Sequence, residues 1–401
     1  MIIMTPTPAM QQYYDLKKQY SDCVLFFRMG DFYEMFEQDA HTAHKVLGIS
    51  ITSRNKNSDT PIALAWIPFH AKEKYLPLLI EAGYKVAIAE QVSDPKLKWI
   101  VAREVVRVVT PSTLTLESEG YQSEQSTLML ALTHEKGIYG MSWLNISDNT
   151  WKTSECSTLE ELSHWIYKIS PAEWVLSREL FDREDIIGLL EQQPWLNIYC
   201  FDEVKHPNKY LCTHFWVNNL HGFGIEEKPL CQSSSALVLD YIIVHQKWDF
   251  WFLQSLTYQW AGTHLEIDES SLRSLDIIYN FSTQSAIKGT LLWVLNQSKT
   301  PMGKRFMREQ LLQPLQDIKE IEKRQDIIEY FQSDIMLLDT ISHELKQISD
   351  IDAIINRLAL GRALPRDLLN LKKSLSSILR VLDKITESGN KKLIKALELD
   401  R

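Results

Sequence analysis

The stretch DCVLFFRMGDFYEMF, residues 22–36, decides how the first part of this chain folds. Its first half is a short apolar run typical of a buried strand, and from Phe36 onward apolar residues recur at helical spacing. We therefore predict that the strand ends at Gly30 and that Asp31 caps the helix that follows. Residues 32–34 would then lie on the turn between the strand and the helix.

An aromatic side chain and a carboxylate on an exposed turn can act together on a DNA duplex. Phe32 can wedge a base step open, and Glu34 can hydrogen-bond the edge of a displaced base. The alternative is a purely structural pair, in which the aromatic ring is buried in the core and the acid is solvated. Residue types alone favour the structural alternative, because Phe is among the most commonly buried residues.

The composition is that of an ordinary soluble globular protein. The chain has 401 residues, of which 45% are hydrophobic and 24% are charged, and this length predicts two to four domains. The formal net charge of −9 does not suggest a nucleic-acid binder, but residues 1–112 are nearly neutral, with 13 Lys and Arg against 12 Asp and Glu. DNA binding by such a region would depend on local basic residues rather than on long-range attraction.

Cysteine usage and the absence of long apolar runs indicate a soluble cytoplasmic protein. The five cysteines are odd in number and widely spaced, which fits free thiols in a reducing compartment. A zinc site built from Cys200, His206, Cys212 and His214 is a weak alternative, because their spacing fits no usual zinc motif, and no metal site is predicted. The N-terminus lacks the pattern of a signal peptide, and no segment has the ~18 consecutive apolar residues of a membrane span.

The sequence predicts an α/β unit over residues 1–112, a polar linker over 113–126, a second α/β unit over 127–231, and helices from 232 to 401. In the first unit the expected strands are 23–28, 49–52, 62–67, 84–90 and 104–110, and the expected helices lie near 8–20, 33–47 and 70–82. In the predicted α/β region over 127–231 we expect a hairpin over 128–144, helices near 158–168, 182–191 and 205–220, and strands near 173–177 and 198–202. Two amphipathic helices follow residue 350, one on each side of Pro365.

Several motifs resemble those of the MutS family of DNA mismatch repair proteins. The run from Thr7 to Glu34 is similar to the opening of that family, and the likeness is also strong over 300–370. The resemblance implies a mixed α/β mismatch-recognition domain (1–112), an RNase H-like α/β connector (127–231) and a partial all-α core or lever domain (232–401). Trp66 and Ser112 stand where the family usually has glycine, so the local surface near them is expected to differ.

The resemblance also implies a site and a partner, namely double-stranded DNA with mismatches or small loops. Phe32 would be the wedge, Glu34 would bond a base, and Tyr33 would join them at the DNA. A mispaired base has already lost part of its stacking, so discrimination would come mainly from deformability. Phosphate contacts are expected from basic residues of the first domain: Arg54, Lys56, Lys72, Lys74, Lys96 and Arg107. Arg28 is either an ion-pair partner of Asp31 or a further DNA contact.

No catalytic activity is predicted for this chain. MutS proteins continue to an ATPase domain, but the sequence has no G-x-x-x-x-G-K-[ST] motif; Gly303-Lys304 lacks the upstream glycine and the following hydroxyl. ATP and Mg²⁺ are therefore expected only with a domain beyond residue 401. Family members form homodimers, and other mismatch repair proteins are candidate partners. The second hypothesis is a protein-interaction module that does not bind DNA itself.

Overall fold

The structure is a computed structural model. It describes residues 7–54, 61–92, 101–114, 128–146, 148–190, 197–260, 265, 267–278, 280, 288–389 and 393–394. The chain forms two compact units. The first contains residues 1–121, 126–146 and 171–254, and the second contains residues 122–125, 147–170 and 255–401.

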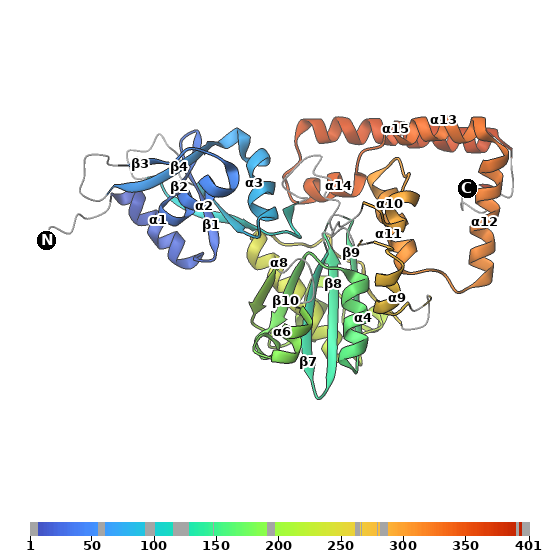
Figure 1. Ribbon diagram of the computed structural model, residues 1–401, viewed down its shortest axis with the longest axis horizontal. Helices are drawn as coiled ribbons and strands as arrows, with labels where there is room; N and C mark the ends of the chain where they lie inside the picture. Colours follow the sequence, from blue (N-terminus) through green and yellow to red (C-terminus); the bar gives the residue numbers. More distant parts are fainter. Residues whose placement is uncertain are drawn as a thin grey trace. The chain divides into compact units, whose positions relative to one another are not determined.

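Six strands form the first sheet, in the order β3-β4-β2-β1-β5-β6 (Figure 1). β1 and β5 are parallel, and the other neighbours are antiparallel. Most predicted strands and helices of this region are present close to their expected positions. The strand expected over 49–52 lies instead at Thr52–Arg54, and the helix expected near 33–47 begins at Glu37. The strands are β1 (Cys23–Met29), β2 (Phe32–Phe36), β3 (Thr52–Arg54), β4 (Ile62–Pro68), β5 (Lys85–Gln91) and β6 (Arg103–Val109), and the helices are α1 (Pro8–Gln19), α2 (Glu37–Leu47), η1 (Phe69–Ala71) and α3 (Lys72–Glu81).

Alternating side chains of β1 divide the core of this region into two layers, one on each face of the sheet. Leu25 and Phe27 pack with Tyr13 of α1. Val24 and Phe26 point the other way, into a cluster that includes buried side chains of α2 and α3. Because successive residues of a strand point to opposite faces, α1 covers one face of the sheet, and α2 and α3 cover the other.

The predicted turn into a helix at residues 32–34 is wrong. These residues belong to β2, which forms a hairpin with β1 through the two-residue loop Gly30-Asp31. Gly30 has a φ of +59°, a left-handed conformation that such a short loop requires and that glycine adopts without strain. Asp31 caps no helix, because α2 begins only at Glu37. The strand pairing of β2 therefore decided the structure here, and the helical spacing begins only after it.

A second set of strands follows: the first unit holds four in the order β11-β10-β7-β8, and in the second unit β9 pairs in parallel with β12 (Figure 1). β7 and β8 form the expected antiparallel hairpin, and β10 is parallel to both β7 and β11. The mixed α/β character predicted for the connector is confirmed. Its elements are β7 (Met129–Glu135), β8 (Ile138–Asn145), β9 (Thr150–Cys156), α4 (Leu159–Ile169), β10 (Glu173–Ser177), α5 (Arg178–Phe181), α6 (Glu184–Leu190), β11 (Ile198–Phe201), α7 (Pro207–Phe215), η3 (His221–Phe223), α8 (Pro229–Gln246) and β12 (Leu256–Tyr258).

α8 is buried along most of its length and packs on β7 and β8. Gly140 of β8 permits this close approach, since a Cβ atom there would lie 2.5 Å from the carbonyl oxygen of Leu230. The domain boundary expected between residues 231 and 232 falls inside α8. Local periodicity predicted the helix correctly but could not indicate which sheet it covers.

A buried carboxylate joins the end of the first α/β region to the connector, within the first compact unit. Glu173, the first residue of β10, has no exposed surface. It accepts hydrogen bonds from the backbone N–H and the hydroxyl of Ser112, at 3.0 and 2.5 Å, and from the hydroxyl of Tyr241 of α8, at 2.5 Å. The Ser112 hydroxyl, which a glycine would lack, therefore supplies a hydrogen bond to a buried carboxyl oxygen in this chain.

The second unit is mainly helical. Its further helices are α9 (Glu269–Ser274), α10 (Leu291–Leu295), α11 (Pro301–Leu312), α12 (Ile318–Ser333), α13 (Ile335–Leu345), α14 (Ile351–Ala359) and α15 (Pro365–Glu387). The two predicted amphipathic helices are present as α14 and α15. Their apolar stripes are only partly buried, with Ile355 and Leu368 47% and 54% exposed, and α15 packs on α13 around Ile385. Among the described helices, none has both the length and the apolar character needed to cross a membrane.

Candidate nucleic-acid interface

One end of the β2–β4 strand pair exposes two aromatic rings. Phe32 begins β2 and is 38% exposed, and Trp66 of β4 is 46% exposed. Their ring centroids are 4.7 Å apart and the ring planes are inclined by 76°, an edge-to-face contact. Phe32 therefore lies at the surface of its domain, as a wedge residue must.

Helix α1 explains why this face of the sheet changes from core to surface along one strand. Phe36 points to the same face as Phe32 and packs edge-on against Tyr13 of α1, with the ring centroids 4.8 Å apart. The side chain of Phe36 is fully buried by this contact. At the other end of β2, Phe32 keeps more than a third of its surface exposed.

Glu34 lies between these two rings on the same face, since alternate residues of a strand share a face. Its side chain is 21% exposed, and Nη1 of Arg54 lies 3.5 Å from its Oε2. Burial raises the pKa of the Glu34 carboxyl above its ordinary value, and the guanidinium groups of Arg54 and Arg103 oppose that shift. Burial therefore favours the neutral form of the Glu34 carboxyl.

Tyr33 points to the opposite face of the sheet. Its side chain is buried, its ring packs against Phe26 at a centroid distance of 5.6 Å, and its hydroxyl donates a hydrogen bond to Glu90. The direct DNA contact expected of Tyr33 does not fit this position. The hairpin is the physical reason, because it places neighbouring residues of β2 on opposite faces.

The basic residues expected to contact phosphates are not gathered on one face. Arg54 ends β3 and lies beside Glu34. Arg107 pairs with Ile88 across β5 and β6, and Ile88 belongs to the layer under α2 and α3, so Arg107 is on the opposite face from Phe32. Lys72 begins α3, on that opposite side as well. Lys56 and Lys96 lie outside the described residues.

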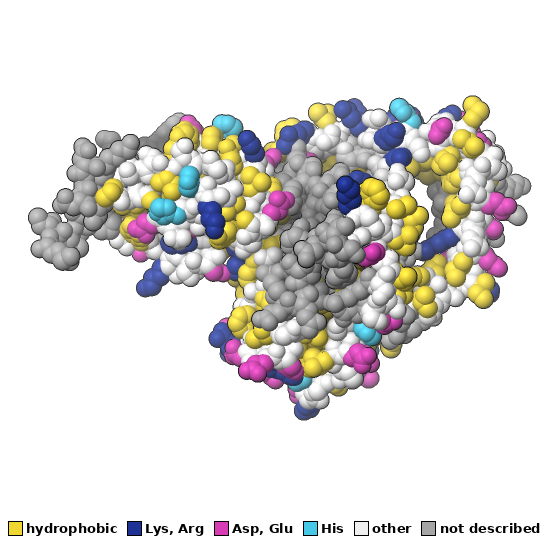
Figure 2. Space-filling model, viewed as in Figure 1, with side chains coloured by type: hydrophobic (Ala, Val, Ile, Leu, Met, Phe, Trp, Pro, Cys, Tyr) yellow, Lys and Arg dark blue, Asp and Glu magenta, His cyan; other side chains and the backbone are white. Residues whose placement is uncertain are grey.

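The surface charge follows the same pattern. On the face shown in Figure 2, the described Lys and Arg side chains are interspersed with acidic and apolar ones. This mixture agrees with the net charge of −9. Attraction of DNA over long distances is therefore weak, and any binding must depend on local contacts.

Arg28 supports the hairpin loop next to the exposed rings. Its guanidinium group stacks on the ring of Phe69 at 3.9 Å, its Nη1 lies 3.8 Å from Oε2 of Glu90, and its Nε donates to the carbonyl oxygen of Gly30. Pairing with Asp31 was one of the two roles expected of Arg28. Arg28 instead pairs with Glu90. The backbone N–H of Phe69 donates to the carbonyl of Asp31 at 2.9 Å and fixes the same loop.

Two features near Glu34 were not predicted from the sequence. Arg103 of β6 acts on the Glu34 carboxyl although it lies far away along the chain, and its Nε donates to the carbonyl of Arg28 at 2.5 Å. Trp66 was expected to alter the local surface, but its contact with Phe32 was not anticipated. Both features depend on strand pairing between distant segments, and no local pattern signals them.

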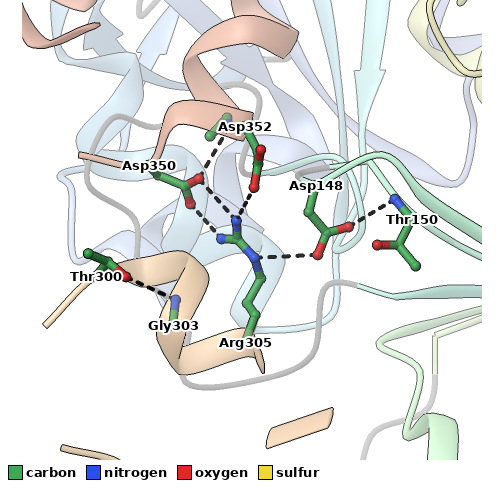
Figure 3. Close-up of polar contacts among 8 residues, drawn as sticks. Asp148, Thr150, Thr300, Gly303, Arg305, Asp350 and Asp352 are labelled. Carbon is green, nitrogen blue, oxygen red and sulfur yellow. Dashed lines mark hydrogen bonds and ion pairs between the residues drawn. The ribbon is translucent and has the colours of Figure 1, made fainter. Parts of the chain in front are cut away.

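A second polar centre, in the second unit, is structural. Arg305 of α11 contacts Asp350 at 2.6 and 3.1 Å, Asp352 at 2.9 Å and Asp148 at 3.4 Å (Figure 3). Burial raises the pKa of Asp148 and of Asp352, and the Arg305 guanidinium opposes both shifts. One arginine thereby holds together the segment before β9 and the start of α14.

The Gly303-Lys304 pair lies in the first turn of α11 and not in a phosphate-binding loop. Thr300 caps this helix, its hydroxyl oxygen accepting a hydrogen bond from the N–H of Gly303 at 3.0 Å (Figure 3). The helix N-terminus is therefore satisfied by the chain's own side chain.

Three family models match the chain in order along its length. Residues 7–118 match MutS domain I, residues 127–249 match MutS domain II, and residues 270–400 match MutS domain III. The chain belongs to the MutS family. The match to MutS domain II runs past residue 246, which agrees with placing α8 in the connector.

Individual MutS proteins resemble this chain over most of its length. The DNA mismatch repair protein MutS of Methanococcoides burtonii is 36% identical over 389 residues, which are 94% of this chain and 43% of that relative. The protein of the same name from Staphylococcus haemolyticus is 35% identical over 374 residues, 93% of this chain and 40% of the relative. The one from Dehalococcoides mccartyi is 36% identical over 373 residues, 93% of this chain and 43% of the relative. The chain thus spans about two fifths of the length of these MutS relatives.

Proposed function

We propose that this chain recognises mispaired or unpaired bases in double-stranded DNA and that it works in DNA mismatch repair. The observation that supports this most is the exposed ring of Phe32, which stands at a hairpin edge on the same face as Glu34. Membership of the MutS family supports the same function. A structural aromatic residue would be expected inside the core, where Tyr33 and Phe36 are found.

Phe32 acts as a wedge in this proposal. Inserting an aromatic ring between stacked bases costs a few kcal/mol and kinks the duplex. A mispair or an unpaired base has already lost part of its stacking energy, so the ring enters there at a smaller cost. The protein then distinguishes damaged from intact pairing by how easily the duplex deforms and not by its sequence.

Glu34 bonds the displaced base. A carboxylate gains nothing from Coulomb attraction among phosphates, so its use at a DNA surface must be as a hydrogen-bonding group. The raised pKa of Glu34 supports a neutral carboxyl at the DNA, which donates one hydrogen bond and accepts another. Arg54 is the expected phosphate contact on the same sheet face, while Lys72 and Arg107 would need the DNA to pass around to the other side.

Fluorescence anisotropy with labelled duplexes tests the proposal. Three duplexes are titrated: one with a G·T mispair, one with an unpaired T and one fully paired, each at about 50 mM and about 200 mM salt. We expect tighter binding to the two defective duplexes. We expect Phe32→Ala to weaken that binding about tenfold, since stacking of one base on an aromatic ring contributes about 1–3 kcal/mol.

Phe181→Ala is the matched control, because Phe181 in α5 is 39% exposed and Phe32 is 38% exposed. The control should bind all three duplexes as the parent does. Equal binding of paired and defective duplexes by the parent, or no effect of Phe32→Ala, would refute the wedge.

A protein-interaction module is the second candidate function, and one cavity favours it. A pocket of 540 Å³ lies between α7 and α8, and its lining includes Lys209, Ile243, Trp216 and Trp251. Trp216 is 73% exposed and Trp251 is 49% exposed, and exposed tryptophans at a pocket are common anchors for partner proteins. An absence of DNA binding even at low salt would support this candidate in place of the sensor.

A further inference from the structure

Trp66 lies beside Phe32, where it can influence which DNA defects Phe32 recognises. It lies directly opposite Glu34 in the antiparallel pairing of β2 and β4. Directly paired residues share a face, so Trp66 projects on the same side as Glu34 and Phe32. Its indole is almost half exposed and makes an edge-to-face contact with the ring of Phe32. The chain therefore presents an aromatic pair where a lone ring would suffice as a wedge.

Burial cannot explain why a tryptophan stands at this position. A Trp side chain contributes most to folding when its large apolar surface is removed from water. Trp151 and Trp174 of this chain do so, with 1% exposure each, whereas Trp66 leaves 46% in water. The neighbours of Trp66 on its own strand, Ala65 and Ile67, supply the buried side chains of β4 instead.

The geometry of the pair limits how it can approach DNA. The minor groove of regular B-DNA is about 6 Å wide. The edge-to-face arrangement places the second ring to the side of the first, with the centroids 4.7 Å apart, so the pair is broader than one ring. If Phe32 enters a base step, Trp66 must enter the groove beside it or push its walls apart. The cost of that widening depends on how firmly the adjacent bases are paired.

We propose that Trp66 is a specificity-determining residue that makes this protein favour unpaired nucleotides over base–base mispairs. The inference rests on the proposed function of Phe32 as a wedge. At an unpaired nucleotide the duplex bends readily and the groove opens, so both rings fit at little extra cost. A mispair such as G·T has lost less of its stacking than an unpaired nucleotide and keeps hydrogen bonds between its two bases, so the groove must be widened against them.

The ratio of two dissociation constants tests the inference. The Kd for the G·T duplex is divided by the Kd for the unpaired-T duplex, measured for the parent, Trp66→Gly and Trp66→Leu. Leucine keeps an apolar side chain suited to the strand, so it remains informative if the glycine variant does not fold. We expect the ratio to exceed one in the parent and to fall about fivefold in both variants, because the cost of widening the groove beside Trp66 is then removed.

Trp293→Ala is the control, because Trp293 in α10 is also exposed, at 53%, and lies in the other unit. It should leave the ratio unchanged. A parent ratio at or below one, or a ratio that stays within about twofold in both Trp66 variants, overturns the inference. If Phe32→Ala nevertheless weakens binding to both duplexes, the wedge stands and only the role of Trp66 is refuted. If Phe32→Ala has no effect, the proposed function fails and this inference fails with it.

Discussion

Replacing Glu34 by glutamine tests whether a neutral carboxyl bonds the DNA. Glutamine has nearly the same shape as a protonated glutamate and likewise offers one donor group and one acceptor, but it carries no titratable charge. The structure gives the direction of the expected effect. Burial raises the pKa of Glu34, and the guanidinium groups of Arg54 and Arg103 oppose that shift. Phosphates near a bound duplex would raise this pKa further.

The size of the effect follows from proton linkage. If the complex takes up one proton at Glu34, the Kd of the parent rises by up to about tenfold for each pH unit above the pKa of the free protein. Glu34→Gln should remove this slope, bind mismatched DNA about as well as the parent at low pH, and bind it more tightly than the parent at high pH. Both proteins should bind about equally where the parent carboxyl is already protonated.

The cost to folding should be small. The contact of Glu34 with Arg54 is 3.5 Å long and partly exposed, and such ion pairs contribute at most about 1 kcal/mol. Because the folded pKa is raised, the stability that Glu34 contributes is present below its unfolded pKa and is lost as the pH rises through the folded pKa. The variant should therefore unfold within about 1 kcal/mol of the parent and lose this weak pH dependence.

Anisotropy titrations of the G·T duplex from about pH 5.5 to about pH 8.5 make the measurement, with urea unfolding at each pH as a check on the fold. Glu104→Gln is the matched control, because Glu104 is an exposed carboxylate of the same sheet. Binding by Glu34→Gln that is about tenfold weaker at every pH, with an intact fold, would refute the neutral-carboxyl mechanism. A parent Kd that does not change with pH would refute it equally.

Three substitutions test the interactions that hold the domains in shape. The buried guanidinium of Arg357 lies 2.6 Å from Asp367, and Asp367→Ala leaves it without this partner. The substitution should lower the free energy of opening α14 and α15 by about 3–5 kcal/mol, measured by amide hydrogen exchange. Tyr241→Phe removes one of the donors to the buried Glu173 and should destabilise the first unit by about 1–3 kcal/mol in urea unfolding; an unchanged midpoint would contradict that role. Arg305→Ala should destabilise the second unit by about 1–3 kcal/mol, because it leaves three carboxylates without their common partner. Mild acid should partly restore this last variant, since protonation relieves the repulsion, and a loss that grows in acid would contradict the account.

The sequence predicted most strands and helices of the first region because their patterns are local. Short apolar runs within 62–67 and 84–90 can be recognised within single segments, and so can the helical spacing over 8–20. β2 was missed for a related reason. Its five residues precede a helical pattern that begins at Phe36, and the short loop Gly30-Asp31 was interpreted as a helix cap and not as a hairpin turn.

Some residues of the candidate site could be chosen from the sequence, whereas the position of others became known only from the structure. Phe32 and Glu34 were selected from their residue types and from the likeness to the MutS family, and the structure places both on one face. Tyr33 was selected with them but belongs to the core, and Arg107 lies on the opposite face. One residue of offset along a strand is enough to separate side chains in this way, and local sequence did not reveal the offset.

By itself the sequence determined the MutS family, the order of α/β and helical regions, and the presence of an aromatic residue and a carboxylate two positions apart. Only the tertiary structure decided that α1 covers Phe36 and leaves Phe32 at the surface, and that Trp66 meets Phe32 there. The physical reason is range. Periodicity and turn chemistry are encoded within a few neighbouring residues, whereas the exposure of a side chain depends on segments that pair and pack across the whole domain.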